Sequence, residues 1–186
     1  MTALARFRSP LGTLAVEATD EGLCGISLAG AARPRAPVTA ASRVHLEGSL
    51  AALEAYFRGE SVALPPLDLH GSAFDLVVWH GLLRIPFGET RTYGELAAEL
   101  GMPGAARAVG AANGRNPVWI LVPCHRVVAS GGGLGGYAGG LDAKRWLLAH
   151  EAGHAPALRS PERAAPPLPA ERGEGPGTPL TAASRR

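Results

Sequence analysis

The spacing of apolar residues changes along this chain, and the change restricts the folds that the chain can adopt. Over residues 3–30, apolar and polar residues alternate around two turn signals, one near Pro10 and one near Gly22. Alternation with a period of two predicts three short antiparallel strands. Over residues 44–60 the apolar residues recur at helical spacing instead, so we expect a helix after the strands.

Helical spacing continues through most of the second half of the chain. We expect helices over residues 72–86, 92–101, 104–114 and 141–151. Thr92 with Glu95 three residues later is a capping box that starts the second of them. The predicted fold class is therefore α+β. A small N-terminal α/β domain, a three-stranded antiparallel sheet plus a helix, precedes a mainly helical, winged-helix-like C-terminal domain with a helix-turn-helix.

Composition marks the domain boundaries. Residues 1–66 form the predicted N-terminal domain, residues 70–152 the helical domain, and a proline-containing linker joins them. From residue 153 to residue 186 the sequence is dense in proline, glycine and charge without any periodicity, which predicts a disordered tail.

Three sequence features bear on the expected cellular compartment: the N-terminus, the longest apolar stretches and the number of cysteines. The N-terminus has no continuous apolar segment of the kind found in secretion signals, and no stretch approaches the ~18 apolar residues of a membrane span. Two cysteines, Cys24 and Cys124, are few for a secreted scaffold. We expect a cytoplasmic protein with two free thiols and no membrane partner.

One stretch concentrates reactive side chains. In "NPVWILVPCHRVV", residues 116–128, an apolar run leads into Cys124 and His125. A thiol reacts as its thiolate, a neighbouring base helps to form that thiolate, and a carboxylate can orient the base. Glu151 is the candidate carboxylate. Neighbouring side chains on a strand point to opposite faces, so the chain must leave the strand near Pro123, or a water must connect the pair.

Most lone cysteines are buried small hydrophobes, so the adjacency of Cys124 and His125 alone is weak evidence for a nucleophile. Cys24 lies in an alternating strand without a nearby base, and we interpret it as inert.

The two short helices over residues 92–114 suit a DNA-binding helix-turn-helix. Arg107, Arg115 and Arg126 fall in a stretch without acidic residues between Leu100 and Leu141. A solvated helix face is the alternative explanation for such a charge pattern.

Several motifs together resemble one family. "IPFGETRTYGELA", "AARAVGAA", "GRNPV", "PCHRVV" and "GGLGGYAGGLDAKRWLLAHE" occur in order between about residues 74 and 151. They resemble the O6-alkylguanine-DNA alkyltransferases, also called methylated-DNA–protein-cysteine methyltransferases. The resemblance implies DNA repair by irreversible, single-turnover transfer of an alkyl group to the protein's own cysteine. O4-alkylthymine stays open as a second substrate.

The resemblance also implies roles for residues of the site. Cys124 would attack the alkyl carbon, with His125 as base through a water and Glu151 orienting it. Asn116 would brace the Cys–His network, although an ordinary Asn-Pro turn residue is the alternative. Tyr93 would help to turn the base and donate a proton to the departing guanine.

The implied partner is double-stranded DNA that contains O6-alkylguanine, bound through its minor groove with the damaged base flipped out. Arg107 would fill the gap left by that base. Other expected DNA contacts are Tyr93, Gly94, Ser130 and Arg115, and the expected pocket residues are Val127, Tyr137 and Ala138. We expect a monomer without a cofactor. We also predict no metal, because His45, His70 and His80 are scattered.

Two departures from the family pattern bear on function. Trp119 stands where the family more often has a smaller residue or proline, and we expect it to fill the core rather than narrow the pocket. "FDLVVW" is more apolar than the family's usual version, which favours a weaker DNA contact there. The main alternative function is a protein that binds alkylated DNA or regulates without transfer. A cysteine hydrolase is a third, and the helix-turn-helix argues against it.

Overall fold

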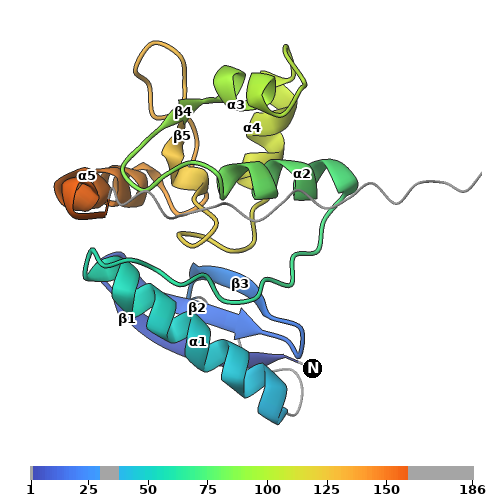
Figure 1. Cartoon of the computed structure of the whole chain (residues 1–186), viewed down its shortest axis with the longest axis vertical. Coiled ribbons are helices and arrows are strands. Elements are labelled where there is room, and N and C mark those ends of the chain that lie inside the picture. The colour runs from blue at the N-terminus through green and yellow to red at the C-terminus, as the bar shows by residue number, and fades with distance from the viewer. Residues whose placement is uncertain (1, 30–37, 159–186) are drawn as a thin grey trace, which may run out of the picture.

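The computed structural model describes residues 2–29 and 38–158. In Figure 1 a sheet with one helix lies below a group of helices. Most of the tail predicted over residues 153–186 lies outside the described residues. The last helix, α5 (Leu141–Leu158), continues past residue 152, where the sequence analysis placed the end of the domain.

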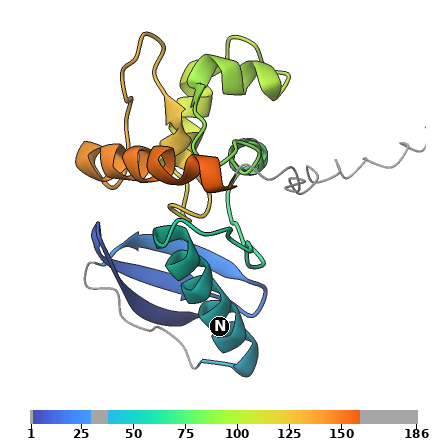
Figure 2. The same cartoon turned by 60° about the vertical axis from the view of Figure 1, so that its left-hand side comes forward.

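The N-terminal half is the predicted three-stranded antiparallel sheet, with strands β1 (Ala3–Ser9), β2 (Gly12–Ala18) and β3 (Leu23–Leu28) in the order β1-β2-β3. Helix α1 (Ala40–Phe57) lies across one face of this sheet, as Figures 1 and 2 show from two sides. The helix begins earlier than the apolar spacing indicated, because the Thr39 side chain accepts a hydrogen bond from the backbone N–H of Ser42 and caps it there.

The C-terminal half contains α2 (Ala73–Leu82), α3 (Tyr93–Glu99), α4 (Ala106–Gly114) and α5. Capping boxes start α2 at Ser72 and α3 at Thr92, at the two cap residues that the sequence predicted. The α3–α4 pair is the expected helix-turn-helix. Trp79 on α2 fixes it in place by donating from Nε1 to the carbonyl of Ala112 on α4, at 2.9 Å.

A short parallel pairing that the sequence analysis did not predict joins β4 (Arg91–Thr92) to β5 (Val127–Val128). Along the chain, the 3₁₀ turn η1 (Cys124–Arg126) comes directly before β5. The pairing therefore places the start of α3 beside the chain that leaves Cys124. Strands of two residues carry no period, so sequence patterns do not reveal them.

The two halves meet along β3. The backbone N–H of Ile26 donates to the carbonyl of Pro117 at 2.9 Å, and the N–H of Trp119 donates to the carbonyl of Ile26 at 3.3 Å. The linker between the two halves also pairs with β3, since the backbone N–H of Leu23 donates to the carbonyl of Pro66 at 2.8 Å. The edge of the sheet is thus covered by the segment that leads to Cys124, which ties that segment to the N-terminal domain.

Across residues 2–29 and 38–158, no helix has the length and apolar character needed to cross a membrane.

Candidate active site

The apolar run before Cys124 is a series of turns rather than the strand expected from its composition. Asn116 holds these turns together: its side-chain amide donates to the carbonyl of Val122 at 2.8 Å, and its Oδ1 accepts from the N–H of Val118 at 3.0 Å. Ile120 adopts a φ of 72°, which is strained for a β-branched residue. The chain therefore leaves extended geometry before Pro123, in the turn over residues 119–121, and it enters η1 directly after that proline.

Cys124 is 3% exposed, and its environment acts on the thiol in two directions. Burial raises the pKa of the Cys124 thiol. Hydrogen bonds from the Asn116 side chain and from the backbone N–H groups of Cys124 and His125, together with the charge of Lys144, lower it. The thiol is therefore protonated at rest, while the donors that would stabilise a thiolate are already in place.

His125 and Glu151 form a buried pair, with His125 Nε2 at 2.7 Å from Glu151 Oε1. Burial lowers the pKa of His125 against the opposing pull of Glu151, which favours a neutral ring. Because Nε2 faces a carboxylate, it carries the proton, and Nδ1 is left as the acceptor. Nδ1 is buried without a hydrogen-bond partner among the described residues. The ring thus has the free lone pair that a general base requires.

Glu151 collects donors from several parts of the chain. Arg126 donates to it from Nε at 2.8 Å and from Nη2 at 3.0 Å, and the N–H of Gly88 donates at 2.8 Å. Tyr56, on α1, donates its hydroxyl at 2.8 Å. Burial alone would raise the pKa of Glu151, but the bonds and charges of His125 and Arg126 hold it well below its usual range.

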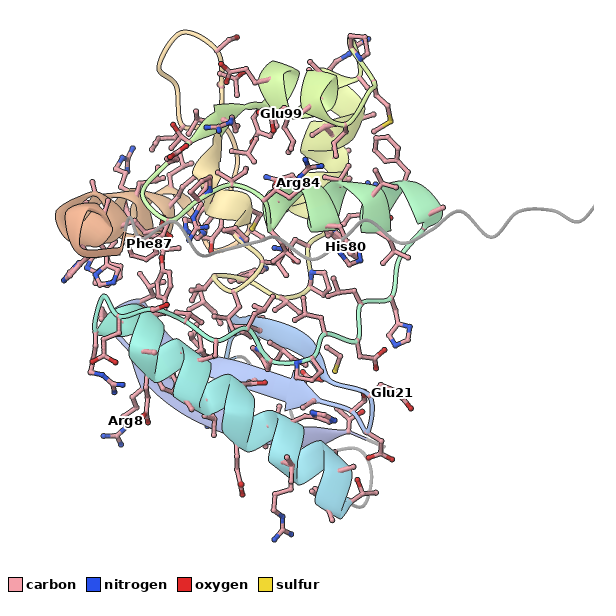
Figure 3. The ribbon with its side chains drawn as sticks, viewed as in Figure 1. Arg8, Glu21, His80, Arg84, Phe87 and Glu99 are labelled. Atoms are coloured by element: carbon pink, nitrogen blue, oxygen red, sulfur yellow. The ribbon has the colours of Figure 1, made fainter. Side chains whose placement is uncertain are left out.

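Sequence reasoning missed three of these partners. Arg126 was counted among the cations of the helix-turn-helix region, but it is 7% exposed and is bonded to Glu151. In the sequence, Tyr56 looked like an ordinary residue of a helix face and Gly88 like an ordinary turn residue, so neither pattern indicated a contact with Glu151. Phe87, labelled in Figure 3, lies next to α5 and supports the Arg126 guanidinium, which sits 5.5 Å from the centre of its ring.

A pocket of about 440 Å³ opens onto Cys124. Tyr137 and Ala138, both predicted for the pocket, line it. Val127, also predicted, does not: it is fully buried, and its carbonyl accepts a hydrogen bond from Lys144. The remaining lining comes from Tyr93, Gly110, Asn113, Gly114, Trp119 and Gly136.

Trp119 corrects an expectation. We expected it to fill the core; it does pack against the core while partly buried, but it also lines the pocket and packs on Tyr137, with their ring centres 5.7 Å apart. The two rings together form part of the wall of the pocket that opens onto the thiol.

A second hollow of about 400 Å³ lies next to the first and shares Tyr93 and Gly110 with it. It brings together Arg107, Gly94 and Ser130, three of the residues predicted to contact DNA. Arg115 lies elsewhere: its Nη2 is 2.6 Å from Asp75 Oδ1, so this cation pairs with α2 instead of lining the hollow.

Tyr93 stands between the two hollows. Burial raises the pKa of its hydroxyl, which therefore stays protonated at neutral pH, although the backbone of Gly136 and the Asn113 side chain act in the opposite direction. Gly135 has a φ of +68°, and a Cβ there would lie 2.7 Å from the Tyr93 hydroxyl oxygen. Only glycine lets the loop approach Tyr93 this closely.

Lys144 is fully buried and fastens the same loop. Its Nζ donates to the carbonyl of Val127 at 2.6 Å and to that of Gly136 at 3.1 Å. Through these bonds α5 holds both the strand after Cys124 and the loop over the pocket. The part of the chain that the structure describes contains no group of three or more His, Cys, Asp or Glu residues placed to bind a metal.

Replacing Lys144 with Met tests its effect on the thiol. Loss of the cation should raise the pKa of Cys124 further, so that iodoacetamide alkylates this residue at least about threefold more slowly at fixed pH. The pH dependence of alkylation, measured in a Cys24→Ser background, reports the shift. Arg145→Ala removes an exposed cation from the same helix as a control. Equal alkylation rates in the Lys144→Met and parent proteins would contradict the electrostatic role.

Comparison with known proteins agrees with this site. The family model described as "6-O-methylguanine DNA methyltransferase, DNA binding domain" matches residues 73–153, and the one described as "6-O-methylguanine DNA methyltransferase, ribonuclease-like domain" matches residues 4–70.

Relatives that carry the name methylated-DNA–protein-cysteine methyltransferase are similar over much of the chain. The one from Mycolicibacterium paratuberculosis is 57% identical over 111 residues, which is 59% of this chain and 67% of the relative. The one from Methanosarcina acetivorans is 44% identical over 150 residues, which is 77% of this chain and 94% of the relative.

Solved structures are similar over most of the chain. The crystal structure of Mycobacterium tuberculosis O6-methylguanine methyltransferase has a TM-score of 0.70 at 42% identity, over 84% of this chain and 96% of that one. A structure of Mycobacterium tuberculosis OGT in complex with DNA has a TM-score of 0.67 at 42% identity, over 80% of this chain and 92% of that one. Both domains thus match in sequence and in structure, and the chain belongs to the 6-O-methylguanine DNA methyltransferase family.

Proposed function

We propose that Cys124 accepts the alkyl group in this protein. Family membership makes the chain a DNA-binding repair protein with methylated-DNA–protein-cysteine methyltransferase activity. One observation carries the assignment of the acceptor: the pocket ends at a buried thiol, directly followed in sequence by a neutral histidine that a carboxylate orients.

The proposed reaction is a displacement at the alkyl carbon. The thiol proton of Cys124 passes to Nδ1 of His125 through a water. The sulfur then bonds to the alkyl carbon, while the bond from that carbon to O6 breaks and leaves its electron pair on guanine. Tyr93 protonates the departing guanine, and the proton held by His125 restores Tyr93 through solvent. In sum, the thiol hydrogen moves to guanine and the alkyl group moves to sulfur.

We infer that the base reaches the pocket by leaving the duplex. The pocket is hollowed into the protein beside the α3–α4 pair, so a stacked base could not touch Cys124. Arg107 is exposed on α4 in the adjoining hollow and would fill the space that the base vacates, from the minor-groove side. Gly94 and Ser130, in the same hollow, would contact the DNA backbone. Tyr93, between the two hollows, would help to turn the damaged base.

We further propose that the protein acts as a monomer in the cytoplasm and reacts once. The product is a thioether, and none of the groups around Cys124 can return it to a thiol. Because the sulfur is itself the acceptor, the reaction as proposed calls on no cofactor. Guanine O6 adducts are the proposed substrates, and O4-alkylthymine is a second candidate to compare in the same assay.

Intact-mass measurement tests the acceptor. After incubation with a duplex that carries one O6-methylguanine, the protein should gain one methyl group, saturating at one per molecule, and digestion should place the methyl on Cys124. Cys124→Ala should gain none and still retard the duplex, while Cys24→Ser should react like the parent. A retarded duplex without any adduct would favour the alternative of a damage-binding protein. A methyl group on another residue would overturn the assignment.

Arg107→Ala tests the flipping role. If Arg107 stabilises the extrahelical base, its loss should slow repair of duplex DNA by about tenfold or more, since flipping costs a few kcal/mol. Reaction with free O6-methylguanine base should be nearly unchanged. Arg8→Ala is the control, because that exposed arginine lies on β1 in the N-terminal domain, lines neither hollow and should alter neither reaction. Equal losses on duplex and free base would exclude the role.

A further inference from the structure

The carboxylate that orients His125 has a partner in the other domain. Tyr56 lies near the end of α1 and is 2% exposed. Its hydroxyl donates to Glu151 Oε1 at 2.8 Å and lies 3.4 Å from His125 Nε2. Tyr56 and His125 therefore share one carboxylate oxygen, although they come from different domains.

The ring of Tyr56 has a packing role that a phenylalanine could also perform. It makes edge contacts with Phe57 at 5.3 Å and Phe87 at 5.8 Å between ring centres, and a tilted contact with His150 at 5.4 Å. The contact with His150 packs α1 against α5, the contact with Phe87 packs it against the loop after α2, and none of them uses the hydroxyl. A buried hydroxyl costs free energy unless it is bonded, and here its bond is made to the catalytic carboxylate.

We propose that Tyr56 is a positioning residue for alkyl transfer: its hydroxyl occupies part of Glu151 Oε1 and thereby limits how strongly the carboxylate draws a proton onto His125. The inference rests on the proposed function, in which His125 must be neutral to take the proton of Cys124.

The charges around His125 set the direction of the effect. Glu151 is the group that favours the protonated ring, while burial, Arg126 and Lys144 oppose it. Tyr56 and Tyr137 also face the ring, with ring centres 6.4 Å away in both cases, and Cys124 precedes it in η1. Both tyrosines stay protonated because burial raises their pKa values, so neither adds a charge. Tyr56 consequently acts only as a donor to Glu151.

Removing the hydroxyl leaves Oε1 with fewer donors. The carboxylate then interacts more strongly with the proton on Nε2, and the charged form of His125 becomes easier to form. The pKa of His125 should rise, and the neutral base should be lost at a higher pH than in the parent protein. The acid limb of the rate profile should therefore move to higher pH.

The test is the pH profile of single-turnover methyl transfer at saturating duplex. In Tyr56→Phe, the midpoint of the acid limb should rise by about half a pH unit, which lowers the rate about threefold below the midpoint. The plateau at higher pH should change by less than about twofold, because a neutral His125 is still present there. Phe57→Leu, which removes packing from the same helix without touching a hydroxyl, should lower the Tm and leave the midpoint unchanged.

Site-specific 3-fluorotyrosine at position 56 provides the opposite change. Its hydroxyl is more acidic and donates more strongly, so the midpoint should fall instead of rising, and the ring keeps its packing. This variant decides the question even if Tyr56→Phe folds poorly.

The outcomes distinguish a failure of the proposed function from a failure of the role proposed for Tyr56. A parent protein that transfers no methyl group overturns the proposed function, and this inference with it. A parent that transfers while both Tyr56 variants keep its midpoint overturns this inference alone. A lowered plateau with an unmoved midpoint would reduce Tyr56 to a packing residue.

Discussion

The buried carboxylate of Glu151 is the interaction on which the rest of the site depends. It receives donors from η1, from the loop after α2 and from α1, and it sits on α5. A buried anion is tolerated only when it is bonded on all sides, so each donor must be held in place. Donors from both domains therefore meet at the carboxylate that faces His125.

A second set of contacts connects the thiol with the surface that meets DNA. Lys144 ties α5 to β5 and to the loop over the pocket, and Gly135 lets that loop touch Tyr93. Tyr93 begins α3 and lines both hollows. Tyr93 thus joins the hollow beside the helix-turn-helix to the pocket in front of Cys124, and Trp119 and Tyr137 line that pocket together.

Sequence patterns predicted much of this arrangement and missed specific parts of it. The alternating strands and the caps at Ser72 and Thr92 are local features, so local residue types reveal them. The contacts of Tyr56, Arg126 and Lys144 join residues far apart in the chain, and their residue types alone are equally typical of a helix face or a DNA contact. Arg115 and Val127 also have partners that sequence patterns did not indicate: Arg115 pairs with Asp75 on α2, and the carbonyl of Val127 accepts a hydrogen bond from Lys144.

The protonation of His125 is the most direct test of this account. Nitrogen NMR of ¹⁵N-histidine-labelled protein at neutral pH, with the His125 signals assigned by comparison with His125→Gln, reports which ring nitrogen carries the proton. The account predicts a neutral ring with its proton on Nε2, facing Glu151, and a bare Nδ1. A proton on Nδ1, or a doubly protonated ring in the resting protein, would contradict the assignment of His125 as the base that activates Cys124.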